Sequence, residues 1–247
     1  MSALLRAEVI KLRTTRTFVA LAAVTVATSL LLAGLVSLLS KSTKESVITD
    51  VFTTDTTGLF ILVLGIVGIA GEWRHRTIAG SLLAEPRRRR FLAAKTLAYA
   101  VAGMALSLVV SVSVALLGSA ILAARDLPLP DLGDLIVQIG HNALAAALLG
   151  AWGVVLGALV RNQVVAIVGV LLASFVIEPL LLGLAPEIAR FGPFVALPTA
   201  AQDVRAADIG FENVTFAAPA IAALLMLAWI GAAFAAGAAL LRRRDLV

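Results

Sequence analysis

The sequence predicts an all-α membrane protein with six transmembrane helices, and three observations support this fold class. The 247-residue chain is 61% hydrophobic and 14% charged, whereas soluble domains are near half apolar and a quarter charged. Six windows reach or approach the roughly 20 apolar residues that a helix needs to cross a bilayer. These windows are continuous, whereas the strands of a membrane barrel alternate in segments of about 10 residues. We therefore expect lipid to cover much of the apolar surface.

Residues 1–17 predict an amphipathic helix that precedes the first span. Basic residues fall on one face of this segment, and the other face carries apolar residues at helical spacing, Leu4, Leu5, Val9 and Leu12. A helix of this kind lies in the boundary between lipid headgroups and acyl chains. We therefore expect an interfacial helix over 1–17.

The predicted spans, in chain order, are 18–39, 52–70, 97–124, 141–160, 164–184 and 216–241. The second is the weakest, because its outer third is rich in threonine and contains Asp55. We expect the first span to stay in the mature protein, because its apolar stretch exceeds the roughly 7–15 residues of a cleaved signal peptide. Together these segments form a single transmembrane domain over 1–247.

The basic residues predict that both termini are cytoplasmic. With six crossings and the amino terminus inside, 15 of the 20 lysines and arginines lie on the inner side. The five on the outer side are Lys41, Lys44, Arg125, Arg190 and Arg205. Because cytoplasmic loops carry an excess of lysine and arginine, the net charge of +5 is explained by topology. We expect the lipid bilayer, and no nucleic acid, as the partner of these charges.

Three connections between the spans have distinct characters. Residues 71–96 form the one substantial cytoplasmic loop, and 161–163 form a tight inner turn. Residues 185–215 form the longest outer segment, in which aromatic residues lie among prolines: Pro186, Phe191, Pro193, Phe194, Pro198 and Phe211. This composition predicts short helices that re-enter the outer membrane interface before the last span.

The sequence offers little for catalysis or metal binding. The chain has no cysteine, and its two histidines, His75 and His141, are far apart and lack a carboxylate at ligand spacing. It also has no Gly-x-x-x-x-Gly-Lys-Ser/Thr phosphate loop. A membrane-embedded enzyme needs converging carboxylates, histidines or a nucleophile at membrane depth. We therefore predict that the chain is not an enzyme and that it binds no cofactor or metal itself.

The loop 71–96 contains a predicted two-turn amphipathic helix. Thr77 can cap this helix and Pro86 stops it, while one face carries Ile78, Leu82 and Leu83. A short apolar helix that is rigidly joined to two spans suits a groove on a partner protein. The alternative interpretation is a basic loop that fixes topology and binds anionic lipid headgroups.

This arrangement resembles the membrane subunits of ATP-binding-cassette transporters of the ABC-2 type. The resemblance spans nearly the whole chain, from the amphipathic start with Glu8 and Lys11 to the long outer segment before the last span. The loop is its sharpest part, with the matching residues Glu72, Arg76, Thr77, Leu82, Leu83, Pro86, Arg88 or Arg89, and Lys95. The family commonly has glycine before the threonine, where this chain has Arg76.

The resemblance implies that the loop is a coupling helix seated in a cleft of a separate ATPase subunit. The implied docking residues are Glu72, Arg76, Thr77, Ile78, Leu82, Leu83, Pro86, Arg88 and Arg89. ATP and Mg would be bound by that partner, and the complex would hold two membrane subunits, either identical or different. The implied function is that of an exporter permease in a bacterial cell membrane, and the apolar interior favours a hydrophobic or amphipathic substrate such as a drug, antibiotic or lipid.

The alternative function is a secondary transporter without an ATPase partner, which usually shows inverted repeats and charged or broken helices near the midplane. Glu178 is the residue to weigh for it, because it follows the apolar stretch 164–177 and intramembrane carboxylates are often functional. It could line the substrate path. The other interpretation is that the fifth span breaks at Pro179 and that Glu178 reaches outer water.

Small residues predict close helix packing in two spans. Span four carries Gly150, Gly153 and Gly157, which suit either an internal contact or a seam between two copies. Span six carries Gly231, Ala232, Ala235, Ala236, Gly237 and Ala239, and we expect this face to be internal.

Overall fold

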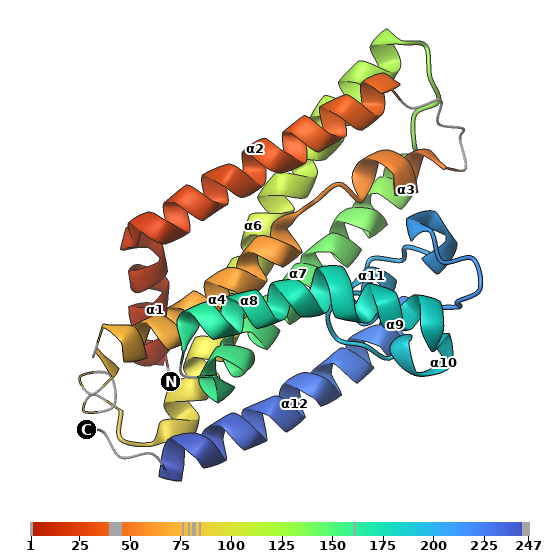
Figure 1. The fold of residues 1–247 in the computed structure, drawn as a ribbon. Coiled ribbons are helices and arrows are strands. Elements are labelled where there is room, and N and C mark those ends of the chain that lie inside the picture. Colours follow the sequence, from red (N-terminus) through yellow and green to blue (C-terminus); the bar gives the residue numbers. More distant parts are fainter. Residues whose placement is uncertain are drawn as a thin grey trace.

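The computed structural model describes residues 2–39, 46–75, 77, 78, 80, 83, 85–160 and 162–243, and the regular structure of these residues is helical (Figure 1). Within these residues, six helical stretches are long and apolar enough to cross a membrane, which agrees with the predicted number of spans. They are Arg16–Leu39, Val47–Arg74, Arg88–Ala124, Leu132–Leu159, Gln163–Leu184 and Pro219–Leu241. The fold is therefore that of a multi-pass helical membrane protein.

The first two spans are preceded and interrupted by short elements. Helix α1 (Ser2–Thr14) turns at Thr15 into α2 (Arg16–Leu39), which lies along the side of the bundle (Figure 1). The second span differs from the continuous helix predicted over 52–70. It consists of α3 (Val47–Phe52) and α4 (Thr57–Arg74), with a helix break at 53–56.

The third and fourth spans are longer than predicted. Helix α6 (Arg88–Ala124) begins nine residues before the expected start at 97, and α7 (Leu132–Leu159) begins nine residues before the expected start at 141. The predicted apolar windows begin only after the polar residues in the first turns of these two helices. In the structure Lys95 and Gln138 are buried and paired with other polar groups, so they lie within the helices.

The fifth span is continuous through α8 (Gln163–Leu172), a π-helical turn (Ala173–Ile177) and α9 (Glu178–Leu184). The segment that follows contains α10 (Pro186–Ala189), α11 (Ala196–Ala201) and a 3-10 turn (Ala206–Ile209). The predicted short helices are therefore present. Helix α12 (Pro219–Arg243) completes the bundle.

Helix α7 is the centre of the bundle and packs against α4, α6 and α12 (Figure 1). The apolar window of this span is 83% buried, compared with 17% for the first and fifth spans. Its glycines allow the close approach, because a Cβ on Gly153 would lie 2.2 Å from the carbonyl oxygen of Leu62, and one on Gly150 would lie 2.5 Å from that of Tyr99. Gly157 likewise packs against α4, so this glycine face is internal and is not a seam between copies.

The expectation for span six is wrong for most of its small residues. On α12 the exposed ones are Gly231, Ala232, Ala235, Ala236 and Ala239, and Gly237 is buried. Helix α12 instead turns bulkier residues toward the core, with Met226 fully buried and Ile230 nearly so. These larger side chains bury more apolar area against α7 than an alanine face could.

The two ends of the bundle are called the α1 end and the α3 end, after the short helix that lies at each. At the α1 end, α1 meets the last turn of α4 and the first turns of α6, and the start of α6 is bonded to the last turn of α12 (Figure 1). At the α3 end lie α3, the last turns of α6 and the first turns of α7 (Figure 1). Helices α1 and α12 thus place the two ends of the chain on the same side, as an even number of crossings requires.

We expect Gly153→Ala to destabilise the fold by about 1–3 kcal/mol, because the added methyl overpacks the contact between α7 and the backbone of α4. Gly140→Ala is the matched control on the same helix, since a Cβ there meets nothing within 4 Å. Thermal unfolding of both purified variants in one detergent measures the difference. Equal midpoints for the two variants would contradict the close approach at Gly153.

Candidate functional site

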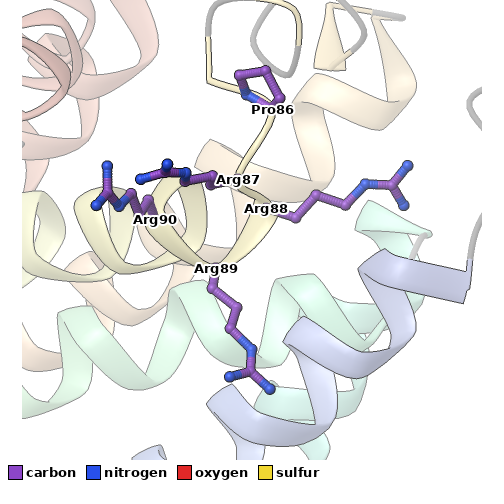
Figure 2. A pocket seen from close by; sticks show the side chains of 5 residues that line it. All are labelled: Pro86, Arg87, Arg88, Arg89 and Arg90. Atoms are coloured by element: carbon purple, nitrogen blue, oxygen red, sulfur yellow. The ribbon is translucent and has the colours of Figure 1, made fainter.

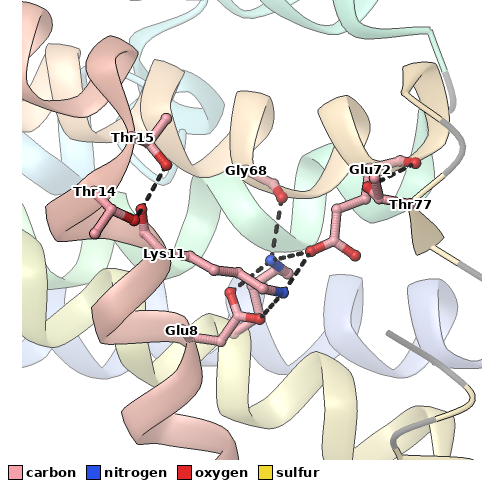
Figure 3. Close-up of polar contacts among 8 residues, drawn as sticks. Glu8, Lys11, Thr14, Thr15, Gly68, Glu72 and Thr77 are labelled. Atoms are coloured by element: carbon pink, nitrogen blue, oxygen red, sulfur yellow. Dashed lines mark hydrogen bonds and ion pairs between the residues drawn. The ribbon is translucent and has the colours of Figure 1, made fainter. Parts of the chain in front are cut away.

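Four charged side chains meet at the α1 end and form the buried ion cluster: Glu8, Lys11, Glu72 and Lys95. The Lys95 ammonium lies 2.7 Å from Glu8 Oε2 and 2.9 Å from Glu72 Oε1. Lys11 Nζ lies 2.8 Å from Glu8 Oε1 and 3.2 Å from the same Glu72 oxygen (Figure 3). Lys95 also donates a hydrogen bond to the carbonyl of Gly68 at 3.2 Å. Each charge therefore has at least one partner of opposite sign.

The cluster draws its members from three helices that lie far apart in the sequence. Glu8 and Lys11 come from α1, Glu72 from the last turn of α4, and Lys95 from the start of α6. Glu72 and Lys95 stand on either side of the loop that joins α4 to α6. The ion pair between them therefore closes the base of this loop, and the contacts to Glu8 attach α1 to the same point.

Burial makes the central ion pairs costly to break. The Lys95 side chain is 2% exposed, whereas that of Lys11 is 49% exposed. Burial acts to raise the pKa of Glu8, but the charge of Lys95 and the hydrogen bonds from Lys11 and Lys95 outweigh it and leave the pKa below its ordinary value. The second oxygen of Glu72, Oε2, is buried and has no hydrogen-bond partner among the described residues, so the cluster can accept one further donor.

A cavity of about 680 Å³ opens beside the cluster. Its lining includes polar residues, namely the four cluster residues together with Tyr99 and Gln163, and apolar residues, namely Leu12, Phe18, Leu64 and Val67. The volume falls within the range of small-molecule sites. The cavity can therefore hold charged and apolar groups together.

Of the predicted docking residues nearest the cluster, Glu72 and Ile78 are turned inward and Thr77 is exposed. Glu72 is only 9% exposed and belongs to the cluster. Thr77 donates its backbone N–H to the carbonyl of Glu72 at 3.0 Å, which folds the chain back over the end of α4. Ile78 is 5% exposed and packs in the main core. Ile78 therefore does not share an exposed face with Leu83.

The later docking residues point outward. Leu83 is 82% exposed, and Pro86 and Arg89 are also exposed. Arg88 is half-buried and donates a hydrogen bond to the carbonyl of Leu241 on α12. Ile78, Gly80 and Leu83 have helical backbone, and the predicted docking residues Arg76 and Leu82 lie outside the described residues.

Glu178 is buried inside the chain, so the interpretation in which it reaches outer water is wrong. Its carboxylate accepts the backbone N–H groups of Phe194, Val195 and Ala196 at 2.8–2.9 Å. A Cβ at Gly192 would lie 2.3 Å from that carboxylate, which explains the glycine there. Glu178 thus holds the segment before α11 against the fifth span.

A polar network surrounds the helix break of the second span, at the α3 end. Asp55 is 6% exposed; it accepts hydrogen bonds from the N–H of Thr57 at 2.8 Å, from Ser111 at 2.8 Å and from Ser107. Asn142 donates to the carbonyl of Phe52 at 3.0 Å. Because unpaired backbone groups are costly inside a membrane protein, these side chains supply the partners that the break removes.

The sequence interpretation did not assign Glu8, Lys95 or Asp55 to buried polar groups. One signal was available for Glu8: it stands four residues after Leu4 and four before Leu12, and therefore on the apolar face of its helix. In the sequence, Asp55 only makes the apolar window of the second span weaker. Its serine partners follow it by 52 and 56 residues, and no local pattern connects positions so far apart.

Among the described residues, no group of three or more His, Cys, Asp or Glu side chains is placed to hold a metal ion. No protein-family model and no curated protein matches this chain. The site is therefore interpreted from its own geometry.

We expect Lys95→Met to destabilise the protein by about 3–5 kcal/mol, because two buried carboxylates lose their shared cation. Lys11→Met removes the same charge from the same cluster, but the half-exposed pair is worth only about 0.2–1 kcal/mol. Chemical unfolding in mixed micelles compares the two variants. Equal losses would show that burial does not distinguish the two lysines.

We expect Glu178→Ala to speed hydrogen exchange at the amides of Phe194, Val195 and Ala196, since their shared acceptor is removed. Glu187→Ala is the matched control, because that side chain is 83% exposed and should leave these amides unchanged. Exchange followed by mass spectrometry on peptides covering 190–200 gives the readout. Unaltered protection in the Glu178 variant would contradict the assigned role.

Proposed function

We propose that this chain is the membrane subunit of an ATP-driven exporter of the ABC-2 type and that the loop between α4 and α6 receives force from a separate ATPase. The observation that carries the proposal is the ion pair between Glu72 and Lys95, with its 2.9 Å separation. It joins the two flanks of the loop at a buried point shared with α1. A push on the loop is therefore delivered to three helices together.

The loop offers a partner an exposed contact above this rigid base. Leu83 is 82% exposed, whereas Ile78 anchors the same loop in the core. An exposed apolar side chain on a short, anchored segment suits insertion into a groove. In this proposal the docking contact is made by Leu83 with Pro86 and Arg89, and Glu72 and Ile78 support the loop from beneath.

The proposal gives a place to the other parts of the chain. Helix α1 lies in the cytoplasmic interface, both termini are cytoplasmic, and the segment 185–215 re-enters the outer interface. Two such subunits, identical or different, assemble with two ATPases that bind ATP and Mg in a bacterial cell membrane. The cargo is a hydrophobic or amphipathic compound, and the cavity of about 680 Å³ beside the ion cluster, lined by both polar and apolar residues, is consistent with that class.

A secondary transporter is the second candidate, and the broken second span favours it. Discontinuous helices with a buried ionisable group form substrate sites in such proteins, and Asp55 lies at the break between α3 and α4. Its carboxylate, however, already accepts three hydrogen bonds from the protein. This saturation leaves little capacity for a coupling ion, so the exporter is preferred.

The test is affinity purification of the chain from its native membrane with identification of co-eluting proteins. We expect an ATPase subunit to co-elute with the unaltered chain and to be lost from Leu83→Asp, because a charge at the exposed apolar contact prevents docking. Leu129→Asp is the matched control, since Leu129 is also exposed (46%) but lies in the loop between α6 and α7.

Absence of any nucleotide-binding protein after gentle extraction of the unaltered chain would refute the exporter proposal. Equal retention of the ATPase by both leucine variants would leave the complex in place and refute the docking role of Leu83. These two results separate the assembly from the contact that is proposed to mediate it.

A further inference from the structure

Four consecutive basic residues at the start of α6, at the α1 end of the bundle, form the arginine patch: Arg87, Arg88, Arg89 and Arg90. The Arg88 guanidinium donates a hydrogen bond to the carbonyl of Leu241 and so joins α6 to the last turn of α12. The fold therefore fixes the position of the patch relative to α12.

The length of α12 fixes the depth of the patch. Helix α12 has 25 residues and is about 37 Å long at about 1.5 Å per residue. The hydrocarbon layer is about 30 Å thick, so both ends of this helix lie at the level of the lipid headgroups. Because Arg88 is bonded to the last turn of α12, the first turn of α6 lies at that same level.

Three of the four patch arginines have no ion-pair partner within the described part of the chain. Arg87, Arg89 and Arg90 are exposed, and no ion pair joins them to a described carboxylate. Glu85 is the nearby acidic residue, and it accepts the backbone N–H of Arg87 at 3.1 Å. The first turn of α6 contains no acidic residue, so the positive end of the helix dipole adds to the arginine charges.

The side chains leave room for an anionic group between them. A hollow of about 590 Å³ is lined by Pro86 and the four arginines of α6, which fan out around the start of the helix (Figure 2). Guanidinium groups bind phosphate oxygens through paired, charge-assisted hydrogen bonds. Clusters of four to eight basic residues beside a membrane span favour anionic lipids.

We infer that the arginine patch binds the phosphate-bearing headgroups of anionic phospholipids in the leaflet at the α1 end. Headgroup depth, exposed uncompensated guanidinium groups and an open hollow coincide at this one surface. The inference goes beyond the proposed function, because such a site would tie α6 and α12 to the membrane in any transport class. It makes anionic lipid a bound partner of the chain.

The experiment uses the purified full chain in nanodiscs that contain phosphatidylcholine and phosphatidylglycerol in equal amounts. Lipids that stay bound after gentle release are counted by native mass spectrometry. We expect the unaltered chain to retain phosphatidylglycerol preferentially. A triple variant, Arg87→Gln, Arg89→Gln and Arg90→Gln, should bind it on the order of 100-fold more weakly, because each basic residue near an anionic surface contributes about a fivefold factor.

The matched control is Arg6→Gln, Arg13→Gln and Arg16→Gln, which removes the same charge from three exposed positions near the same end of the bundle. Because α1 also lies at the interface, this variant should lose a small part of the preference for phosphatidylglycerol, but much less than the patch variant, since its three arginines are spread over residues 6–16. Equal loss in both triple variants would reduce the effect to net charge and overturn the site. Equal retention of the two lipids by the unaltered chain would overturn it without any variant.

A third outcome would assign the patch to a protein. If the Arg87, Arg89 and Arg90 variant keeps its phosphatidylglycerol but loses a co-purifying ATPase, the patch is a docking surface and the lipid inference is wrong. Arg88 is left unaltered in these variants, because its bond to Leu241 holds α6 against α12.

Discussion

The α1 end of this protein depends on one buried ammonium group. Lys95 is almost fully enclosed, and such a charge is tolerated only when partners of opposite sign surround it. Glu8 and Glu72 supply those partners from two other helices, so the position of α1, the end of α4 and the start of α6 are determined together. Loss of Lys95 would leave both carboxylates with only the half-exposed Lys11 as a counter-charge, so this one ammonium group links the three helices.

The other polar side chains inside the bundle are also paired with partners, but those partners include backbone groups and are not charged side chains. Asp55 and Asn142 bond the N–H and carbonyl groups that the break between α3 and α4 leaves unpaired. Glu178 accepts three N–H groups from an irregular segment. Intramembrane carboxylates are commonly interpreted as substrate or ion sites. Here each of them first satisfies the backbone, and that role is sufficient to explain its burial.

The parts of the fold that depend on local sequence could be predicted, and the parts that depend on distant partners could not. The six spans follow from the length and continuity of apolar runs. The starts of α6 and α7 could not be predicted, because a lysine at 95 and a glutamine at 138 predict a position at the membrane interface. Their burial depends on distant partners: Glu8 lies 87 positions from Lys95 in the sequence. The burial of Ile78 was missed for the same reason, because it depends on how the loop folds back over α4.

Helix α6 runs without interruption from the arginine patch, through Lys95, to Ser107 and Ser111 of the polar network. With 37 residues it is about 55 Å long, and no break lies between the two polar sites. Thermodynamic linkage through such a rod is reciprocal. Where binding at the α3 end is coupled to a change at the α1 end, the coupling free energy is therefore the same in both directions. The two polar sites, at opposite ends of the bundle, are joined by one continuous helix.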